Sequence, residues 1–189
     1  MSATNRGAIR HADDFYATPA WCVHRLLERL PLPNGSWLEP AVGDGAIVNA
    51  VNAVLPIVEW HCIDVAYRNP GYRDAGYADF LEWQPEHRFK VVITNPPYSL
   101  AIEFIKHALP MADYVVMLLR LNFLGSAKRS EFFRENMPNV YVLPNRPSFT
   151  PDGRTDATEY CWAVWTPERG RLSGRVQVLA ETPAAERRP

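Results

Sequence analysis

Residues 91–99 have the sequence Val-Val-Ile-Thr-Asn-Pro-Pro-Tyr-Ser. The apolar, β-branched run that begins at Phe89 predicts a buried strand, and two prolines end this strand abruptly. The prolines stiffen the turn and remove N–H donors, so carbonyl oxygens are left exposed. Asn95 adds a side-chain carbonyl, Pro96 adds a main-chain carbonyl, and Tyr98 adds a flat aromatic face. Two acceptors beside a stacking surface suit a planar group that carries an exocyclic amino group.

Strand and helix signals alternate along the chain on both sides of this stretch. Strands are expected at residues 36–40, 58–65, 89–95, 114–122, 139–143 and 159–166. Helices are expected at residues 19–30, 45–55, 99–109 and 125–137, the first capped by Thr18 with Pro19 at its first position. Several strands are apolar throughout, which is typical of a mostly parallel sheet that is covered on both faces. The pattern therefore predicts an α/β fold, and we expect Trp162 in its core.

The composition is that of an ordinary soluble globular protein. The chain has 189 residues, 47% of them hydrophobic and 22% charged, and no apolar run long enough to span a bilayer. No signal-peptide pattern precedes the first expected helix, so we expect a cytoplasmic protein without a membrane partner. We expect residues 1–13 to be flexible, residues 14–166 to form one domain, and residues 167–189 to form a frayed tail. Three widely spaced cysteines and five scattered histidines predict neither a disulfide framework nor a metal site.

A glycine-rich segment at residues 38–45, Leu-Glu-Pro-Ala-Val-Gly-Asp-Gly, follows the first expected strand. In an α/β fold this first crossover is the usual place for a ligand, because glycines let backbone approach the ligand closely. The segment lacks the G-x-G-x-x-G pattern, and Glu39 and Asp44 would repel a pyrophosphate, so a ligand with a positive or neutral end fits better. Asp64, at the end of the next strand, is placed to accept hydrogen bonds from ribose hydroxyls. The alternative is an ordinary βα turn followed by a surface aspartate.

The order of these segments resembles that of the class I S-adenosylmethionine-dependent amino-methyltransferases, and most of all that of the DNA adenine-N6 methyltransferases. Asn-Pro-Pro-Tyr at residues 95–98 resembles their catalytic motif, and residues 38–45 resemble their cofactor loop. Phe-Tyr-Ala-Thr-Pro at residues 15–19 resembles a segment that precedes this loop in the γ-ordered members. Looser similarities lie at residues 62–65, 78–80, 146–149 and 159–162.

The resemblance covers about residues 13–165 and makes residues 14–166 a methyltransferase catalytic domain without a separate target-recognition domain. It implies a Rossmann-like, seven-stranded, mostly parallel sheet with an antiparallel last strand and helices on both faces. It also implies S-adenosyl-L-methionine as the cofactor. The catalytic residues that it implies are Asn95, Pro96, Pro97 and Tyr98. The cofactor contacts that it implies are Tyr16, Thr18, Pro19, Glu39, Pro40, Ala41, Gly43, Gly45, Asp64, Asp79, Phe80 and Asn95. The expected substrate contacts are Tyr98, Arg146, Phe149 and Arg154.

An adenine amino group is a poor nucleophile, because its lone pair is delocalised into the ring. The resemblance implies that Asn95 and the Pro96 carbonyl hold the two amino hydrogens, so that the lone pair faces the methyl group and positioning does most of the work. A base inside a duplex cannot reach such a site, so the base is flipped out or already single-stranded. We expect Tyr98 to stack on one face of the base and Phe149 on the other.

DNA is the expected partner, although a net charge of -1 excludes binding by bulk electrostatics. Between residues 120 and 154 six cations stand against three carboxylates, which indicates either a weak phosphate-binding rim or an ordinary solvated face. Two alternatives remain open: an RNA-base or protein-glutamine N-methyltransferase, and a degenerate module that only binds nucleic acid. A homodimer is also left open. A role in a phage or a restriction-modification system follows from analogy with the family.

Overall fold

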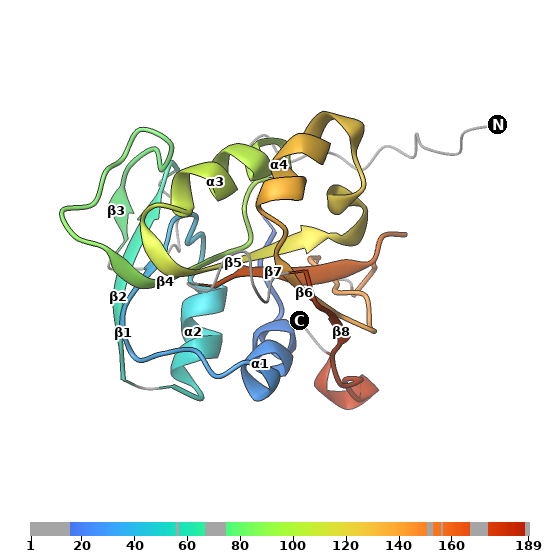
Figure 1. The fold of residues 1–189 in the computed structure, drawn as a ribbon. Coiled ribbons are helices and arrows are strands. Elements are labelled where there is room, and N and C mark those ends of the chain that lie inside the picture. Colours follow the sequence, from blue (N-terminus) through green and yellow to red (C-terminus); the bar gives the residue numbers. More distant parts are fainter. Residues whose placement is uncertain are drawn as a thin grey trace.

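The computed structural model describes residues 16–55, 57–66, 75–150, 153–155, 157–166 and 174–187. The segment expected to be flexible, residues 1–13, lies outside these ranges, as does Phe15. The described residues form one eight-stranded sheet with helices on both of its faces (Figure 1). The strands are β1 (Gly35–Glu39), β2 (Val58–Asp64), β3 (Gly76–Tyr77), β4 (Phe89–Thr94), β5 (Ala112–Arg120), β6 (Asn139–Val142), β7 (Tyr160–Trp165) and β8 (Val176–Val178). The α-helices are α1 (Ala20–Arg29), α2 (Ala46–Asn52), α3 (Ala101–Ala108) and α4 (Ser130–Glu135). Short 3-10 helices are η1 (Tyr98–Leu100), η2 (Leu121–Leu124), η3 (Ala127–Arg129) and η4 (Ala184–Glu186).

The strand order is β3-β2-β1-β4-β5-β7-β6-β8. The first five of these strands pair in parallel, with β1 between β2 and β4. β7 runs antiparallel to both β5 and β6, whereas β8 runs parallel to β6. The chain leaves β1 toward β2 and later returns to β4 on the opposite side of β1. The strand order therefore reverses between β1 and β4, and open α/β sheets bind their ligands at the carboxyl ends of the strands at such a point.

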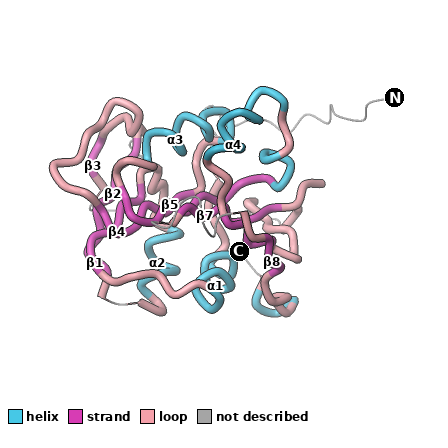
Figure 2. The backbone as a smooth tube through the Cα atoms, viewed as in Figure 1, coloured by secondary structure: helices cyan, strands magenta, loops and turns pink. Residues whose placement is uncertain are grey.

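Helices α1 and α2 cover one face of the sheet, and α3 and α4 cover the other (Figures 1 and 2). Strand β5 contributes to both cores: Val116 and Leu118 pack on the side of α1, whereas Val115, Met117 and Leu119 pack on the side of α3. Successive side chains of a strand point to opposite faces, so a strand that is covered on both faces is apolar at every position. The predicted α/β fold with helices on both faces is confirmed.

The sheet has eight strands, not the seven that were expected. The two strands that the sequence did not indicate, β3 and β8, are two and three residues long; no element was expected where β3 lies, and β8 lies in the expected tail. Such short strands carry no hydrophobic period, because a period needs more residues to be visible. The antiparallel strand was predicted and is β7, but β8 follows it. No described helix is long and apolar enough to cross a membrane.

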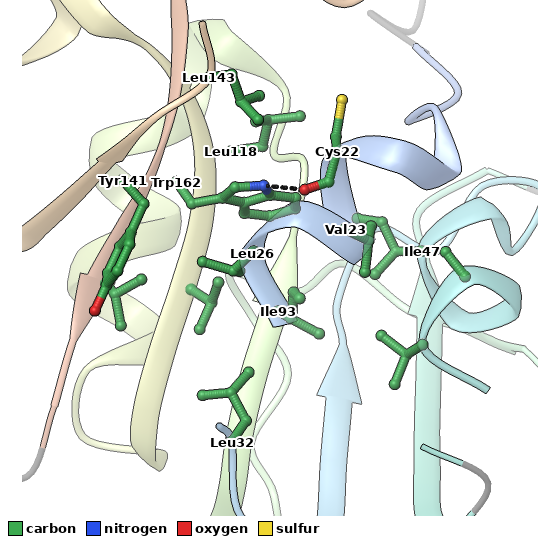
Figure 3. Close-up of a cluster of buried hydrophobic side chains, with 14 of the residues drawn as sticks. Cys22, Val23, Leu26, Leu32, Ile47, Ile93, Leu118, Tyr141, Leu143 and Trp162 are labelled. Atoms are coloured by element: carbon green, nitrogen blue, oxygen red, sulfur yellow. Dashed lines mark hydrogen bonds between the residues drawn. The ribbon is translucent and has the colours of Figure 1, made fainter. Parts of the chain in front are cut away.

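A buried hydrogen bond joins β7 to α1 within the core (Figure 3). The indole Nε1 of Trp162 donates to the Cys22 carbonyl over 2.9 Å, and both side chains are fully buried. Leu26 and Leu118 belong to the same cluster of apolar side chains. The expectation that Trp162 belongs to the core is confirmed, and its N–H has the partner that a buried indole requires.

The tail expected at residues 167–189 is partly ordered against the rest of the molecule, so the expectation of fraying was wrong for residues 174–187. Thr182 is fully buried. Its main-chain N–H donates to Asn145 Oδ1 over 2.7 Å, and its hydroxyl accepts from Arg25 Nε over 3.1 Å. The polar composition of this segment predicted fraying, because long-range hydrogen bonds of this kind leave no local pattern in a sequence.

Asn145→Ala should lower the free energy of unfolding by about 1–3 kcal/mol, because it leaves the buried amide of Thr182 without its acceptor. Urea denaturation measures this change. Asn34→Ala, at an exposed position before β1, is the control and should cost less than about 0.5 kcal/mol. Equal effects of the two substitutions would mean that the hydrogen bond between Asn145 and Thr182 adds nothing to stability.

Candidate functional site

A pocket opens at the carboxyl ends of β1, β2 and β4, beside the point where the strand order reverses. Its empty volume is about 790 Å³ when the open mouth is included. The expected cofactor contacts that line it are Tyr16, Thr18, Glu39, Pro40, Ala41, Asp64, Asp79, Phe80 and Asn95. Three others, Pro19, Gly43 and Gly45, do not line it. Of the expected catalytic residues Asn95 and Pro97 line the pocket, whereas Pro96 and Tyr98 do not.

The glycine-rich segment wraps around the end of β2. Gly43 and Gly45 have φ angles of 54° and 83°, in the left-handed region that other residues rarely adopt. The Gly43 N–H donates to Asp64 Oδ2 over 2.8 Å, and the Ala66 N–H donates to Asp64 Oδ1 over 2.9 Å. Asp64 therefore also holds the glycine-rich segment in place through its hydrogen bond to Gly43. Its position at a strand end did not indicate this structural role. The two glycines act on the pocket indirectly, by shaping this loop.

Glu39, the last residue of β1, is 1% exposed and reaches the pocket wall. Its Oε1 accepts a hydrogen bond of 3.2 Å from the Ala41 N–H, whereas Oε2 is buried without a hydrogen-bond partner among the described residues. Burial raises the pKa of Glu39 from 4.5 to about 8; the Ala41 amide opposes this rise, and Asp64 adds to it. A buried oxygen without a partner is costly, so it indicates a place where a ligand donates a hydrogen bond or brings a positive charge.

The described lining of the pocket carries acidic side chains and no Lys, Arg or His. The four carboxylates are Glu39, Asp44, Asp64 and Asp79. The net charge of the whole chain is only -1, so this concentration of negative charge is local. Such a field disfavours phosphate groups and favours cations and hydroxyl donors.

Apolar side chains form the other side of the pocket, and sequence analysis had missed most of them. Phe80 is buried and packs against Phe104 with ring centroids 4.9 Å apart. Leu100 and Phe104 also line the pocket. Leu100 ends η1 and Phe104 lies four residues later in α3, and this spacing, typical of one helix face, is the one signal that could have indicated them. The pocket thus pairs a flat apolar wall with an acidic one.

Asn95 follows β4 directly and points its amide at the segment before α1. Its Nδ2 donates to the Tyr16 carbonyl over 3.0 Å and to the Thr18 hydroxyl over 3.1 Å. Because a main-chain carbonyl can only accept, these bonds fix which end of the amide is the nitrogen. Both N–H groups are then used, and Oδ1 is left to accept. Thr18 was expected to cap the first helix, but α1 begins at Ala20 without a side-chain cap and the Thr18 hydroxyl bonds to Asn95 instead.

Four aromatic rings gather next to Asn95, and we refer to Tyr16, Tyr98, Phe149 and Tyr160 as the aromatic cluster. Tyr16 stacks on Tyr98 at a centroid distance of 6.1 Å and meets Phe149 edge-on at 5.8 Å. Tyr160, only 1% exposed, contacts Tyr98 at 6.0 Å and Phe149 at 5.1 Å. The fold therefore brings the expected base-stacking residues Tyr98 and Phe149 to one place. Tyr160 was not predicted to be part of this cluster. It is paired with Arg120 of β5 in the sheet.

Several of the cations of residues 120–154 have partners within the chain. The Arg146 guanidinium bonds to Glu159 with an Nε–Oε1 distance of 3.1 Å, and it lowers the pKa of that carboxyl. Arg120 lies over the Tyr98 ring at 5.0 Å, and Arg129 lies over Phe123 at 4.0 Å. Arg154 is exposed. The ion pair of Arg146 competes with the phosphate contact that was expected of it, because exposed pairs must break before either partner can bind another charge.

Comparison with known proteins gives a curated relative, whereas no protein-family model matches the chain. The relative is a Type II methyltransferase of Thermus thermophilus, which is 26% identical over 147 residues. The match covers 67% of this chain and 33% of that protein, so the chain spans about a third of the relative's length.

Solved methyltransferases have the same fold. A modification subunit assigned to a type I restriction enzyme of Vibrio vulnificus YJ016 aligns with a TM-score of 0.57 at 16% identity, over 92% of this chain and 48% of that chain. The 23S rRNA methyltransferase ErmE aligns with a TM-score of 0.57 at 13% identity, over 85% of this chain and 72% of that chain. The chain therefore has the Rossmann-like methyltransferase fold.

The raised pKa of Glu39 predicts a pH dependence of stability for the free protein. The pKa is higher in the folded protein than in the unfolded chain, so the contribution of Glu39 is fully present below about pH 4.5 and is lost as the pH rises through about 8. Glu39→Gln keeps an acceptor for the Ala41 N–H and removes the titration. Urea denaturation between pH 5 and pH 9 should show a smaller loss of stability in this variant than in the wild type. Parallel pH profiles of the two proteins would contradict the assigned shift.

Proposed function

We propose that the protein binds S-adenosyl-L-methionine in this pocket and transfers its methyl group to the N6 amino group of a flipped or single-stranded adenine in DNA. The observation that carries the proposal is the Asn95 amide, whose two N–H groups are bonded to Tyr16 and Thr18 so that its oxygen is presented as an acceptor. This acceptor lies at the edge of an acidic pocket at the carboxyl ends of the strands, in a methyltransferase fold.

The residues of the pocket fit the proposed cofactor. S-adenosylmethionine supplies a methyl group that is activated by a sulfonium, and the molecule also carries an ammonium group and ribose hydroxyls. The orphaned Oε2 of Glu39 suits a cationic group, and the carboxylate of Asp64, which lines the pocket, is an acceptor suited to ribose hydroxyls. Asp79 and Phe80 would hold the adenine end, with a polar contact and an apolar face respectively. A nucleoside triphosphate fits poorly, because four carboxylates and no cation of the described lining face it.

We propose that the chain promotes methyl transfer by positioning the amino group of the base. Oδ1 of Asn95 and the main-chain carbonyl of Pro96 would accept the two hydrogens of the amino group, which favours a pyramidal nitrogen with its lone pair directed outward. Asn95 can accept a hydrogen bond from the amino group only if its amide oxygen points toward that group. Its bonds to Tyr16 and Thr18 hold the amide in this orientation. Pro97 closes the same side of the pocket and begins the turn into η1, which places Tyr98 beside the acceptors. Tyr98 would carry the base by stacking.

DNA is favoured as the substrate by the curated relative, which is named a type II methyltransferase, and by the structural similarity to a restriction-enzyme modification subunit. On this basis we place the activity in DNA modification within the cytoplasm, as in restriction-modification or phage systems. An RNA base is the second candidate, because an rRNA methyltransferase has the same fold. Arg154 and, once released from Glu159, Arg146 are the proposed phosphate contacts near Phe149.

Asn95→Ala should reduce methylation of DNA by about 100-fold or more, as removal of an oriented polar group does at other active sites. Transfer of label from S-adenosylmethionine to a mixed DNA pool measures it, and calorimetry should still show cofactor binding. Thr18→Val is the matched control, because it removes one bond to Nδ2 but leaves Oδ1 in place, and its loss should be much smaller. Near-normal methylation by Asn95→Ala would remove this residue from the catalytic site.

A further inference from the structure

In the aromatic cluster the rings of Tyr98 and Phe149 form two walls, and Tyr16 and Tyr160 each contact both of these walls. The rings of Tyr98 and Phe149 do not contact each other among the ring pairs of the described residues. Tyr160 is 1% exposed and belongs to β7, so it forms a fixed floor. Tyr16 is only half-buried and contacts both walls.

The ring of Tyr16 is placed as a stacked base would be. It lies almost parallel to Tyr98, with an angle of 21° between the ring planes, and it meets Phe149 at 63°, edge to face. Both arrangements are favourable for pairs of flat aromatic groups. A base that stacks on Tyr98 and touches Phe149 would make the same two contacts, so the ring and the base compete for one space.

We propose that, in the free protein, the side chain of Tyr16 occupies the slot that receives the target base, and that it must leave this slot before a base can bind. The inference rests on the proposed function, because it takes the slot to be a base site. It gives Tyr16 a role on the substrate side, in addition to its place in the wall of the cofactor pocket.

The backbone of Tyr16 allows its side chain to move alone. The Tyr16 carbonyl accepts from Asn95 Nδ2, which anchors the main chain to the sheet. The Thr18 hydroxyl anchors the next residues to the same amide, and α1 follows from Ala20. Rotation about the Tyr16 side-chain bonds therefore vacates the slot without disturbing the acceptor that Asn95 presents. In the free protein the ring keeps water off the apolar faces of Tyr98, Phe149 and Tyr160.

The test measures binding of a free nucleoside, 2-aminopurine riboside, by fluorescence anisotropy. The protein is first saturated with S-adenosylhomocysteine, so that the nucleoside cannot enter the cofactor pocket. Tyr16→Ala should bind the nucleoside about fivefold or more tightly than the wild type, because two ring contacts no longer have to be given up. Tyr16→Phe keeps the ring and should match the wild type. Tyr16→Leu, which keeps apolar bulk but cannot stack, should also bind more tightly and serves if Tyr16→Ala is unstable.

Calorimetry with S-adenosylhomocysteine on every variant separates the two levels of the proposal. If neither the wild type nor the variants bind it, the proposed function itself fails. If it binds, but Tyr16→Ala and Tyr16→Leu bind the nucleoside more weakly than the wild type, Tyr16 is a wall that supports the base and not its substitute. Unchanged nucleoside affinity in both variants would equally overturn the inference.

Discussion

The side-chain amide of Asn95 links the middle of the sheet to the segment that leads into the first helix. Its two N–H groups bond to residues 79 and 77 positions away in the sequence. These bonds orient the amide oxygen, draw Tyr16 and Thr18 into the wall of the pocket and hold Tyr16 within reach of Tyr98. The acceptor, one part of the pocket wall and the aromatic cluster therefore meet at one amide group at the end of β4.

The two acidic residues at the strand ends, Asp64 and Glu39, differ in the hydrogen bonds that their carboxyl groups accept. Asp64 accepts two main-chain N–H groups and holds the glycine-rich segment in place. Glu39 has one such bond, and its second oxygen is buried without a partner among the described residues. Burial raises the pKa of Glu39 to about 8, so this carboxyl ionises less readily than an exposed one. A cationic ligand would favour its ionised form, so ligand binding and proton release would be linked.

Much of the site could be predicted from the sequence, because its parts are rigid or local. A β-branched run followed by two prolines allows few conformations, and it places Asn95 at a strand end wherever that strand lies in the sheet. The glycine-rich segment and Asp64 belong to successive strands, so the topology alone brings them together. Nine of the twelve expected cofactor contacts line one pocket.

The predictions that were wrong concern long-range partners. Nothing near Thr18 in the sequence indicates that its hydroxyl bonds to Asn95 rather than to the helix that follows. The same holds for Thr182, which is buried through Asn145 and Arg25. The ion pair of Arg146, a proposed DNA contact, with a carboxylate 13 positions away was likewise not indicated by any local pattern. Local sequence patterns indicate the conformation of the backbone. The partner of a polar side chain depends on how the whole chain packs.

The identity of the methylated atom tests the central claim most directly. Purified protein is incubated with isotopically labelled S-adenosylmethionine and with separate pools of DNA, RNA and protein, and each pool is then digested and analysed by mass spectrometry. The account predicts labelled N6-methyladenine in DNA, with more label in single-stranded or mismatched DNA than in perfect duplex, since less unpairing energy is spent. Label confined to RNA, to cytosine or to glutamine side chains would contradict it.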